Sequence, residues 1–411
     1  MAVRVLLLTQ WFDPEPTFKG LVFARELVRQ GFEVEVLTGF PNYPGGKLYS
    51  GYKIKLIQRE VIDGVDITRV PLYPNHGQSA FKRVLNYASF AASAMVYGLF
   101  SARRADVIYA YHPPLTVGIA ASLLRLIRGI PVVYDIQDIW PDTLRATGML
   151  TNARALSWVA AICLWVYRQV DHVVVLSPGF KRLLIQRGVA CAKVDVIFNW
   201  ADEAALTFPR GHMPPNFPTA EKFRIVFAGN MGKAQALDTV LEAAAMLRAR
   251  GSRICFVMLG GGVDVPRLKQ IALDMNLPNV LFLPSVPMYE VGSFLSEADA
   301  LLVHLRKDPL FEITIPSKTQ AYMAVGKPLL MAVSGDAADL VLQSGAGVIA
   351  ESENARALMQ AAEQLAAMSP AALIEMGHNA KIYYQEHLAL NVGVAKFGTI
   401  FRRTSASNQA K

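Results

Sequence analysis

A carboxylate, a lysine and the start of a helical pattern stand close together in the stretch EITIPSKTQAYMAVGKP, residues 312–328. Pro316 suits the first turn of a helix, where its missing N–H costs nothing, and Lys318 adds a positive charge in that turn. Backbone amides and a cation at a helix N-terminus favour phosphate oxygens. The residues expected to line such a phosphate site are Thr314, Ile315, Pro316, Ser317 and Lys318.

Two polar side chains flank this helix start. Glu312, just outside it, and Gln320, within the helix, would suit hydrogen bonds to sugar hydroxyls. A plain structural explanation stays open, in which Glu312 stabilises a helix N-terminus and Lys318 is only solvated. The stretch therefore indicates a phosphorylated sugar ligand without excluding that explanation.

Two further loops carry glycine and lysine between a predicted strand and a predicted helix. FDPEPTFKG ends at Lys19 and Gly20, whereas FAGNMGKAQALDT contains Gly229, Asn230 and Lys233. Glycine lets backbone N–H groups approach a phosphate at a helix N-terminus. The first loop alone would pass for an ordinary connection, but two such loops favour a phosphorylated ligand. Neither contains Gly-x-Gly-x-x-Gly, so a standard dinucleotide site is not expected.

Polar side chains also follow two other predicted strands. His112 lies at the end of YAYHPP, and Asp138 lies in the next strand end, DIQDIWPD. Polar groups at strand ends are candidates for acid/base catalysis or for hydroxyl binding. The structural alternatives are a helix cap for Asp138 and a core contact for the nearby Trp140.

The sequence offers no pattern for a metal site. It has no Asp-x-Asp pair and no His-x-x-x-His pair, and its three cysteines lack metal-ligand spacing. We therefore expect neither a metal nor another cofactor, and lysine, arginine and helix dipoles would neutralise a bound diphosphate.

The elements that would position these residues alternate between strands and helices, as in a parallel sheet with crossover helices. The first half contains the predicted strands VRVLLLTQW, EVEVLTGF, ADVIYAYHPP, PVVYDIQD and HVVVLSPG. Residues 201–222 have four prolines and no clear period, and the alternation then resumes with FRIVFAGN, RICFVMLGGG, NVLFLP, ALLVHL and PLLMAV. We expect an α/β protein of two Rossmann-like domains, 1–203 and 204–380, whose parallel sheets face a central cleft.

The composition fits a folded protein that prefers anionic surroundings. Of its 411 residues, 53% are hydrophobic and 18% charged, and its net charge is +8. The N-terminal apolar run is too short for a secretory signal, so a cytoplasmic protein is expected. The apolar segment Val84–Phe100 lies between Lys82-Arg83 and Arg103-Arg104. Three interpretations of this segment remain open: a buried helix, a transmembrane span and a helix in the membrane interface.

The motifs together resemble the retaining glycosyltransferases of family 4, which have the GT-B fold of two Rossmann-like domains. The resemblance covers nearly the whole chain and is carried by QWFDPEPTFKG, GFPNYPGG, YHPPLTVG, DIQDIWPDT, VVLSPGF, FNWADE, FAGNMGKAQALDT and IPSKTQAYMAVGKP. The chain looks most like bacterial surface-polysaccharide enzymes, including those described as L-fucosamine transferases of O-antigen and capsule assembly.

For the donor, the resemblance implies a nucleotide sugar bound mainly to the C-terminal domain. Gly20 would lie near the donor diphosphate, Gly229 and Asn230 would begin the diphosphate loop, and residues 312–317 would touch sugar and phosphate. For the acceptor, it implies the N-terminal domain.

On that acceptor side, the resemblance places His112 and Asp138. It also implies that the last helix, residues 381–405, crosses back onto the first domain. Glu312, His112 and Asp138 are therefore the residues expected to take part in catalysis.

The chain departs from the family pattern in its acids and in its diphosphate cations. Counting back from the Gly-x-Pro glycine puts the family's two glutamates at Ile313 and Ala321, one position after Glu312 and Gln320. The diphosphate loop has Asn230 and Gln235 in place of the family's arginine and lysine. The expected replacement cations are Lys233, Lys318 and either Arg306 or Lys307.

The activity that the resemblance implies is retaining and metal-independent transfer of a sugar, expected to be an N-acetylated amino sugar. The donor would be UDP-linked, and the acceptor would be a polyprenyl-diphosphate-linked saccharide at the cytoplasmic face of the inner membrane. The basic net charge of +8 fits a lipid-borne acceptor and does not call for nucleic acid. Two alternatives are a non-catalytic nucleotide-sugar-binding protein and a sugar-nucleotide epimerase of the same fold.

Overall fold

The computed structural model describes residues 2–75, 77, 79–206, 217–219 and 221–409, which form two compact units. The first unit comprises 1–198 and 393–411, and the second comprises 199–392. The first domain was expected to end at 203, a few residues after residue 198, where the first unit's long segment ends. The second was expected to end at 380, twelve residues before the second unit's end at 392. Residues 201–222, where the alternation of strands and helices was expected to lapse between the two domains, fall partly outside the described residues.

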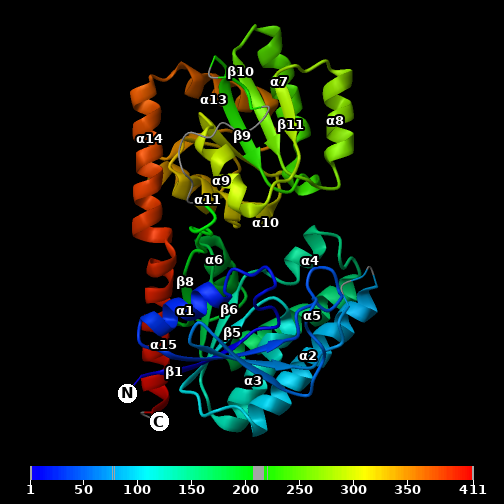
Figure 1. The fold of residues 1–411 in the computed structure, drawn as a ribbon, viewed down its shortest axis with the longest axis vertical. Coiled ribbons are helices and arrows are strands. Elements are labelled where there is room, and N and C mark those ends of the chain that lie inside the picture. Colours follow the sequence, from blue (N-terminus) through cyan, green and yellow to red (C-terminus); the bar gives the residue numbers. More distant parts are fainter. Residues whose placement is uncertain (1, 76, 78, 207–216, 220, 410–411) are drawn as a thin grey trace. The chain divides into compact units, whose positions relative to one another are not determined.

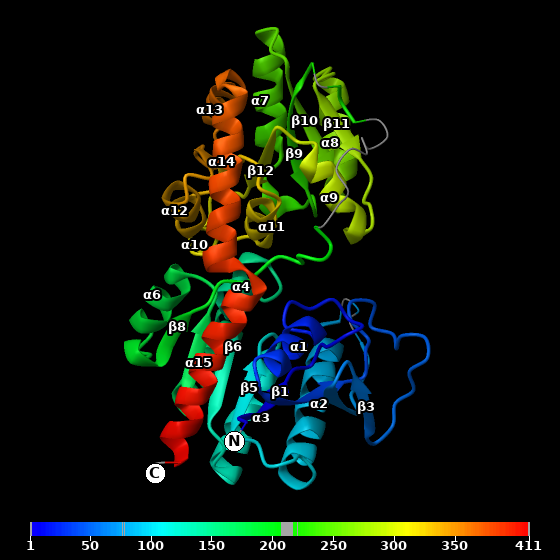
Figure 2. The ribbon, with the colours of Figure 1, turned by 60° about the vertical axis from the view of Figure 1, so that its left-hand side comes forward.

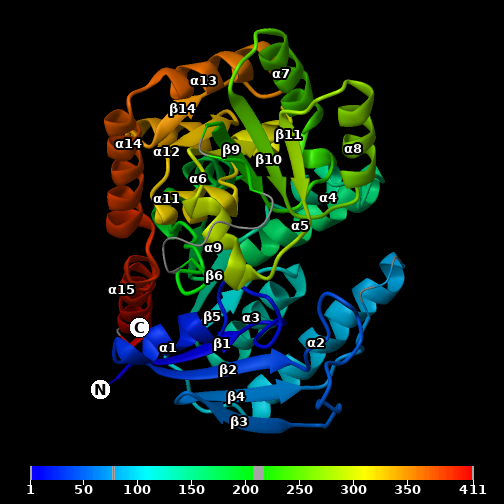
Figure 3. The same ribbon diagram turned by 45° about the horizontal axis from the view of Figure 1, so that its top comes forward.

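An eight-stranded sheet forms the centre of the first unit, in the order β3-β4-β2-β1-β5-β6-β7-β8. All neighbouring strands are parallel except β3 and β4, which form an antiparallel pair at one edge. Figure 3 shows these strands following one another from β3 to β6. The strands are β1 (Arg4–Leu8), β2 (Glu33–Gly39), β3 (Gln58–Ile62), β4 (Val65–Val70), β5 (Val107–Tyr111), β6 (Val132–Ile136), β7 (His172–Val175) and β8 (Val194–Val196).

Helices cover both faces of this sheet. Right-handed crossovers place the helix between β1 and β2 and the helix between β5 and β6 on opposite faces, because those two connections run in opposite directions along the sheet. The helices are α1 (Leu21–Arg29), α2 (Ala80–Phe100), α3 (Leu115–Arg128), α4 (Asp142–Ala146), α5 (Ala153–Gln169), α6 (Pro178–Gln186) and the short η1 (Cys191–Lys193).

The C-terminal helix α15 (Leu390–Gln409) returns to the first unit. Its Phe397 packs edge-on against Phe23 of α1 and Tyr109 of β5, with ring centroids 5.4 Å apart in both pairs. Phe401, one turn further, also contacts Tyr109. The helix is thus part of the first unit's core.

The second unit has a six-stranded, all-parallel sheet in the order β11-β10-β9-β12-β13-β14. Its strands are nearly continuous apolar runs, as expected for a sheet buried on both faces. They are β9 (Phe223–Ala228), β10 (Ile254–Leu259), β11 (Val280–Leu283), β12 (Ala300–His304), β13 (Leu329–Ala332) and β14 (Gly347–Ile349). Both units are therefore Rossmann-like, as predicted.

Crossover helices wrap this second sheet, and α7 and α13 lie side by side against it (Figure 2). The helical segments are η2 (Lys233–Gln235), α7 (Asp238–Ala249), α8 (Val265–Asp274), α9 (Met288–Ser296), α10 (Pro309–Glu312), α11 (Ser317–Val325), α12 (Asp336–Gln343), α13 (Ala355–Ala367), α14 (Pro370–Tyr383) and the π-helical η3 (Tyr384–Leu388).

Each sheet has a point where the order of its strands reverses. In the first unit it lies between β1 and β5, and in the second between β9 and β12. Ligands of such sheets bind beyond the carboxyl ends of the strands at this switch point. The loops that follow these four strands are therefore the places to look for a site.

The predicted apolar segment Val84–Phe100 forms most of α2 in the first unit. Within the described part of the chain, no helix is both long enough and apolar enough to cross a bilayer.

Candidate functional site

The loop after β9 is held in place at the second unit's switch point by close backbone packing. The Gly229 N–H donates to Leu259 O at 2.9 Å, and the Met231 N–H donates to Gly261 O at 2.7 Å. Gly260 and Gly262 have φ of +136° and +147°, and a Cβ at either would lie within 2.2 Å of a backbone oxygen of this loop. The glycines 260–262 are thus the support on which the β9 loop rests.

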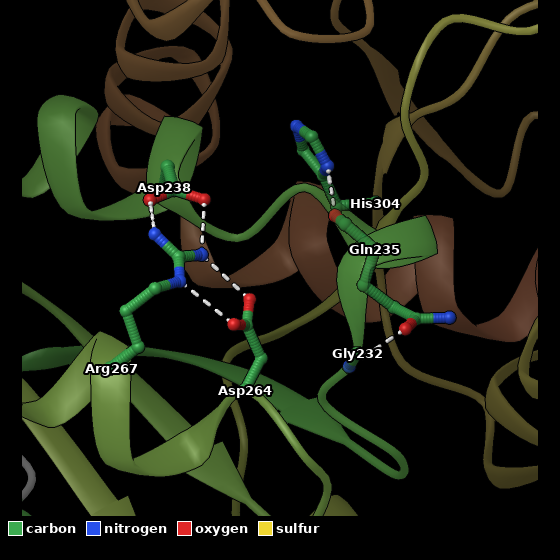
Figure 4. Close-up of polar contacts among 6 residues, drawn as sticks. All are labelled: Gly232, Gln235, Asp238, Asp264, Arg267 and His304. Atoms are coloured by element: carbon green, nitrogen blue, oxygen red, sulfur yellow. Dashed lines mark hydrogen bonds and ion pairs between the residues drawn. The ribbon is translucent and has the colours of Figure 1, made fainter.

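Gln235 shapes the same loop from its far end (Figure 4). Its side-chain oxygen accepts the Gly232 N–H at 3.0 Å, and its backbone oxygen lies 2.7 Å from His304 Nδ1. Nearby, Arg267 donates to both Asp238 and Asp264, which ties the start of α7 to the start of α8. Gln235, where the family has a lysine, therefore contributes loop geometry and no charge.

Lys318, in the first turn of α11, brings a cation against this loop. Its Nζ lies 3.6 Å from the centroid of the Phe227 ring, and a Cβ on Gly229 would lie 3.5 Å from that Nζ. The Nζ is buried, and it has no hydrogen-bond partner among the residues that the structure describes. Burial lowers the pKa of Lys318 to about 7. An ammonium group enclosed in this way gains most from an anionic ligand.

Three other cations that the sequence singled out lie in different surroundings. The Arg306 backbone N–H donates to Ala234 O at 2.9 Å, so this residue borders the β9 loop, and its guanidinium group contacts Asp308 and the Phe311 ring. Lys233 is exposed in the same loop. Lys307 forms an exposed ion pair with Glu351. Lys233 and Arg306 therefore remain beside the loop, whereas Lys307 faces a carboxylate elsewhere.

The N-terminus of α11 is open in the way that a phosphate site requires. Pro316 is its extended N-cap residue, and no side chain caps the helix. The first N–H groups of a helix have no intrahelical partner. Ser317 is exposed and Ile315 is buried, while the Thr314 hydroxyl donates to Leu310 O at 2.7 Å.

Glu312 ends the short helix α10, and its side chain is exposed. Its backbone is fixed by Gly335, whose φ is +78° and where a Cβ would lie 1.9 Å from Glu312 O. Only glycine permits so close an approach in that conformation. The chain therefore holds the Glu312 backbone firmly while its carboxylate faces solvent.

Gln320 has a structural task in addition to any contact with a ligand. It is buried, and its amide nitrogen, assigned from the surrounding acceptors, donates to Pro316 O at 2.8 Å and Ser317 O at 3.1 Å. These bonds brace the helix start. Its contact with sugar hydroxyls stays a prediction.

His304 is a residue that sequence analysis missed. It ends β12, is fully buried, and carries its Nδ1 proton toward Gln235 O, since a carbonyl oxygen can only accept. Its Nε2 is then an acceptor without a partner in the described part of the chain. Burial lowers the pKa of His304, so the ring is neutral. The sequence did offer one signal for it, a histidine at the end of an otherwise apolar predicted strand.

In the first unit, the loop after β1 does not present its lysine to solvent. Lys19 is buried, with Nζ 5.3 Å from the Phe397 ring centroid. Burial lowers the pKa of Lys19 to about 8, and the charge of Asp135 opposes that change. Asp135 itself accepts a hydrogen bond from Tyr109 at 2.6 Å. Lys19 thus belongs to a buried polar group rather than to an exposed phosphate contact.

The start of α1 also differs from the expected open anion site. The Asp13 carboxylate accepts the Leu21 N–H at 2.6 Å, and a Cβ on Gly20 would lie 2.2 Å from the same carboxylate oxygen. The need for glycine at position 20 is explained by this contact. A side chain of the protein itself therefore occupies this part of the α1 N-terminus.

His112 and Asp138 follow the neighbouring strands β5 and β6. His112 is buried, with its ring edge-on to Trp140 at 5.5 Å between centroids, and burial lowers its pKa to about 3. Its Nδ1 has no partner among the described residues. Asp138 is half-buried, and burial raises the pKa of its carboxyl. The His112 imidazole is therefore neutral at cellular pH.

A second feature that sequence analysis missed is an aromatic group at the same edge of this sheet. Trp11, just after β1, stacks on Tyr43 with ring centroids 4.4 Å apart, and Tyr87 of α2 contacts Trp11 edge-on at 6.5 Å. All three rings are half-buried. Partly exposed aromatic faces suit the apolar faces of sugar rings.

No metal site forms among these groups. Within the described ranges, three or more His, Cys, Asp or Glu side chains do not gather in a metal-binding arrangement.

Two family models match the chain, one in each unit. The model described as "Glycosyl transferase 4-like domain" matches residues 21–200, and the model described as "Glycosyl transferases group 1" matches residues 222–368.

Relatives in sequence bear the names of bacterial glycosyltransferases. A protein of Escherichia coli K12 named as the colanic acid biosynthesis glycosyl transferase WcaI is 29% identical over 342 residues, which cover 79% of this chain and 82% of WcaI. A protein of Pseudomonas aeruginosa named as the glycosyltransferase WbjE is 24% identical, covering 73% of this chain and 75% of its own.

Solved structures with the same fold extend over the whole chain. Sucrose-phosphate synthase from Thermosynechococcus elongatus superposes with a TM-score of 0.73 at 16% identity, covering 98% of this chain and 100% of its own. Anabaena HepE, solved in complex with UDP, superposes with a TM-score of 0.69 at 14% identity, with the same coverage. At these identities the likeness concerns the fold.

Proposed function

Because the chain belongs to the family 4 glycosyltransferases with the GT-B fold, in a branch that serves surface-polysaccharide synthesis, we propose that it transfers a sugar from a UDP-linked donor to a lipid-linked saccharide. The donor sugar is an N-acetylated amino sugar in this proposal, and the transfer retains the anomeric configuration without a metal. The acceptor is a polyprenyl-diphosphate-linked saccharide at the cytoplasmic face of the inner membrane.

The observation that carries the proposal is the enclosed cation at Lys318. Its Nζ lies over Phe227 at 3.6 Å, beside the β9 loop and at the open N-terminus of α11. Backbone amides, a helix dipole and a buried ammonium together suit a diphosphate. The UDP complex of the fold relative HepE supports UDP as the nucleotide.

The proposed mechanism relies on stabilising the leaving diphosphate. As the bond from the anomeric carbon to the diphosphate breaks, negative charge grows on the phosphate oxygens, and Lys318 with the α11 amides stabilises it. The leaving diphosphate then accepts the proton of the attacking hydroxyl on the same face of the sugar. Glu312 orients sugar hydroxyls, and no covalent glycosyl intermediate is required.

The first unit supplies the acceptor contacts in this proposal. Asp138 accepts a hydrogen bond from an acceptor hydroxyl. His112, which is a neutral imidazole because its pKa is about 3, positions the same hydroxyl. The stacked Trp11 and Tyr43 rings offer a surface for an acceptor sugar.

The test is incubation of the purified full chain with UDP-, GDP- and dTDP-sugars, with and without a bacterial lipid extract, while nucleotide release and lipid-linked product are measured. Lipid-dependent release of UDP with a new lipid-linked sugar is expected. Tight UDP-sugar binding without turnover under every condition would show the nucleotide-sugar-binding protein instead. Conversion of the UDP-sugar to an isomer without lipid would show the epimerase.

Replacement of Glu312 tests the proposed sugar contact. Glu312→Gln should lower kcat at least about tenfold while leaving UDP affinity unchanged, since the side chain is exposed and its loss removes no packing. Glu353→Gln, another exposed acid of the same unit, is the matched control. Equal kcat values for Glu312→Gln and the control would remove Glu312 from the site.

A further inference from the structure

The outward face of α2 is apolar along its whole length. Val84, Ala88, Ala92, Val96 and Phe100 recur every four residues, and all of them are exposed. Val84 is 61% exposed, Val96 55% and Phe100 83%. These positions extend over about 24 Å of helix. A surface helix of a water-soluble protein normally carries charges on this face.

The neighbouring helices share an unusual charge pattern. α3 packs against both α2 and α5, so the three form one layer of the first unit (Figure 1). Together they carry six basic residues and no acidic one, although acids are common elsewhere in the chain. The six are Lys82, Arg83, Arg125, Arg128, Arg154 and Arg168. Two of them are engaged within the protein, since Arg125 forms an ion pair with Asp171 at 2.6 Å and Arg128 donates to Gly98 O at 2.6 Å.

The outward face of α5 continues the pattern. Trp158 is 74% exposed and Ile162 is 37% exposed, and the exposed Arg154 and Arg168 lie toward the two ends of the helix. Tryptophan and arginine beside aliphatic side chains are typical of helices that lie in a membrane interface.

We infer that the exposed faces of α2 and α5 form a lipid-docking surface that binds the anionic face of a bilayer. The apolar side chains enter the headgroup region, and Lys82, Arg83, Arg154 and Arg168 contact anionic lipid headgroups. The absence of acidic residues from these three helices favours an anionic lipid surface over a protein partner of mixed charge. The inference rests on the proposed lipid-borne acceptor and names the surface that would bring the enzyme to it.

The test is sedimentation of the purified full chain with vesicles, without any sugar donor. One set of vesicles is phosphatidylcholine alone, and the other contains equal parts of phosphatidylcholine and phosphatidylglycerol. The wild type should bind the anionic vesicles and only weakly the neutral ones. Val84→Glu/Val96→Glu should lower partitioning into anionic vesicles by about tenfold or more, because two charges replace apolar side chains at the bilayer surface.

The matched control is Leu273→Glu, at a position on α8 in the second unit that is 73% exposed. It should bind vesicles as the wild type does. Lys82→Gln/Arg154→Gln is a second variant that leaves the apolar face intact. It should weaken binding to anionic vesicles by about fivefold per cation removed, and leave binding to neutral vesicles unchanged.

Three outcomes would overturn the inference: no binding of the wild type to anionic vesicles, equal binding of Val84→Glu/Val96→Glu and Leu273→Glu, or loss of self-association rather than of vesicle binding in the double variant. Thermal unfolding and UDP binding of each variant report on folding.

Sugar transfer to a detergent-solubilised acceptor separates the two proposals. Transfer without vesicle binding would reject the surface alone, and vesicle binding without transfer would reject the proposed function alone.

Discussion

Lys318 is a residue whose charge costs stability in the absence of a ligand. In the unfolded chain its amine titrates near its ordinary pKa of 10.5, whereas burial lowers the pKa to about 7 in the folded protein. The unfolded state therefore binds more protons between these values, and the free energy of unfolding rises with pH from about 7 to 10.5. The ring face of Phe227 offsets part of the cost by attracting the cation.

Lys318→Met should therefore stabilise the protein and weaken UDP binding together. We expect a gain of roughly 2–4 kcal/mol in the free energy of unfolding at pH 7, which shrinks as the pH rises toward 10, and a loss in UDP affinity of about tenfold to a hundredfold. Thermal unfolding at several pH values and calorimetric titration with UDP measure the two effects. Lys269→Met, at an exposed position on α8, should change neither. A destabilised Lys318→Met variant with normal UDP affinity would contradict the assignment.

The same lysine should make UDP binding depend on pH. A bound diphosphate favours the charged ammonium, so binding takes up a proton when the free enzyme has lost it. Above a pH of about 7, UDP affinity of the wild type should fall more steeply than that of Lys318→Arg, whose side chain stays charged. Calorimetry in buffers of different ionisation enthalpy measures the proton uptake directly. Identical pH profiles for the two proteins would show that Lys318 does not titrate on binding.

At the scale of elements, the β9 loop depends on glycines that come from another strand. Gly260→Ala would place a Cβ 2.1 Å from Gly229 O, in a backbone conformation with φ of +136°. The loop must move, and we expect a loss of about 2–4 kcal/mol in stability and at least a tenfold loss in UDP affinity. The comparison is Gly251→Ala, where φ is +65° and no atom lies within 4 Å of the new Cβ. It should lose about 1 kcal/mol and keep its UDP affinity. Similar UDP affinities for the two variants would show that this support does not shape the site.

Sequence patterns predicted most of the elements but little of how they meet. The central strands of both sheets are long apolar runs, so period and length identified them. The β3–β4 hairpin was missed although Asp63-Gly64, with φ of 52° and 81°, is a strong turn signal. The pairing of Lys318 with Phe227 joins residues far apart in the sequence, and no local pattern encodes it. The same holds for Lys19, whose burial against Phe397 depends on a helix at the other end of the chain.

At the scale of the whole molecule, one hydroxyl group joins both segments by which the chain passes between its units. The chain leaves the first unit after Phe198 and returns at Gly393. Close to these points, the Tyr384 hydroxyl accepts the Ala201 N–H at 3.1 Å and donates to Glu203 at 2.8 Å. Glu203 also accepts the Leu390 N–H at 3.0 Å. Tyr384 begins a π-helical turn, a feature that often accompanies function.

Tyr384→Phe should separate sugar transfer from donor binding. The change leaves the buried Ala201 N–H without its acceptor, which costs about 1–3 kcal/mol and lowers the midpoint of thermal unfolding by several degrees. UDP affinity should stay within about twofold of the wild type, because the β9 loop and α11 are untouched. Lipid-dependent transfer, which in our proposal requires both units, should fall several-fold. Tyr383→Phe, a change in the adjacent half-buried ring that contacts His387, is the control and should preserve transfer. If Tyr384→Phe instead reduced UDP affinity and transfer by the same factor, its hydroxyl would act on the donor site and not through the connecting segments.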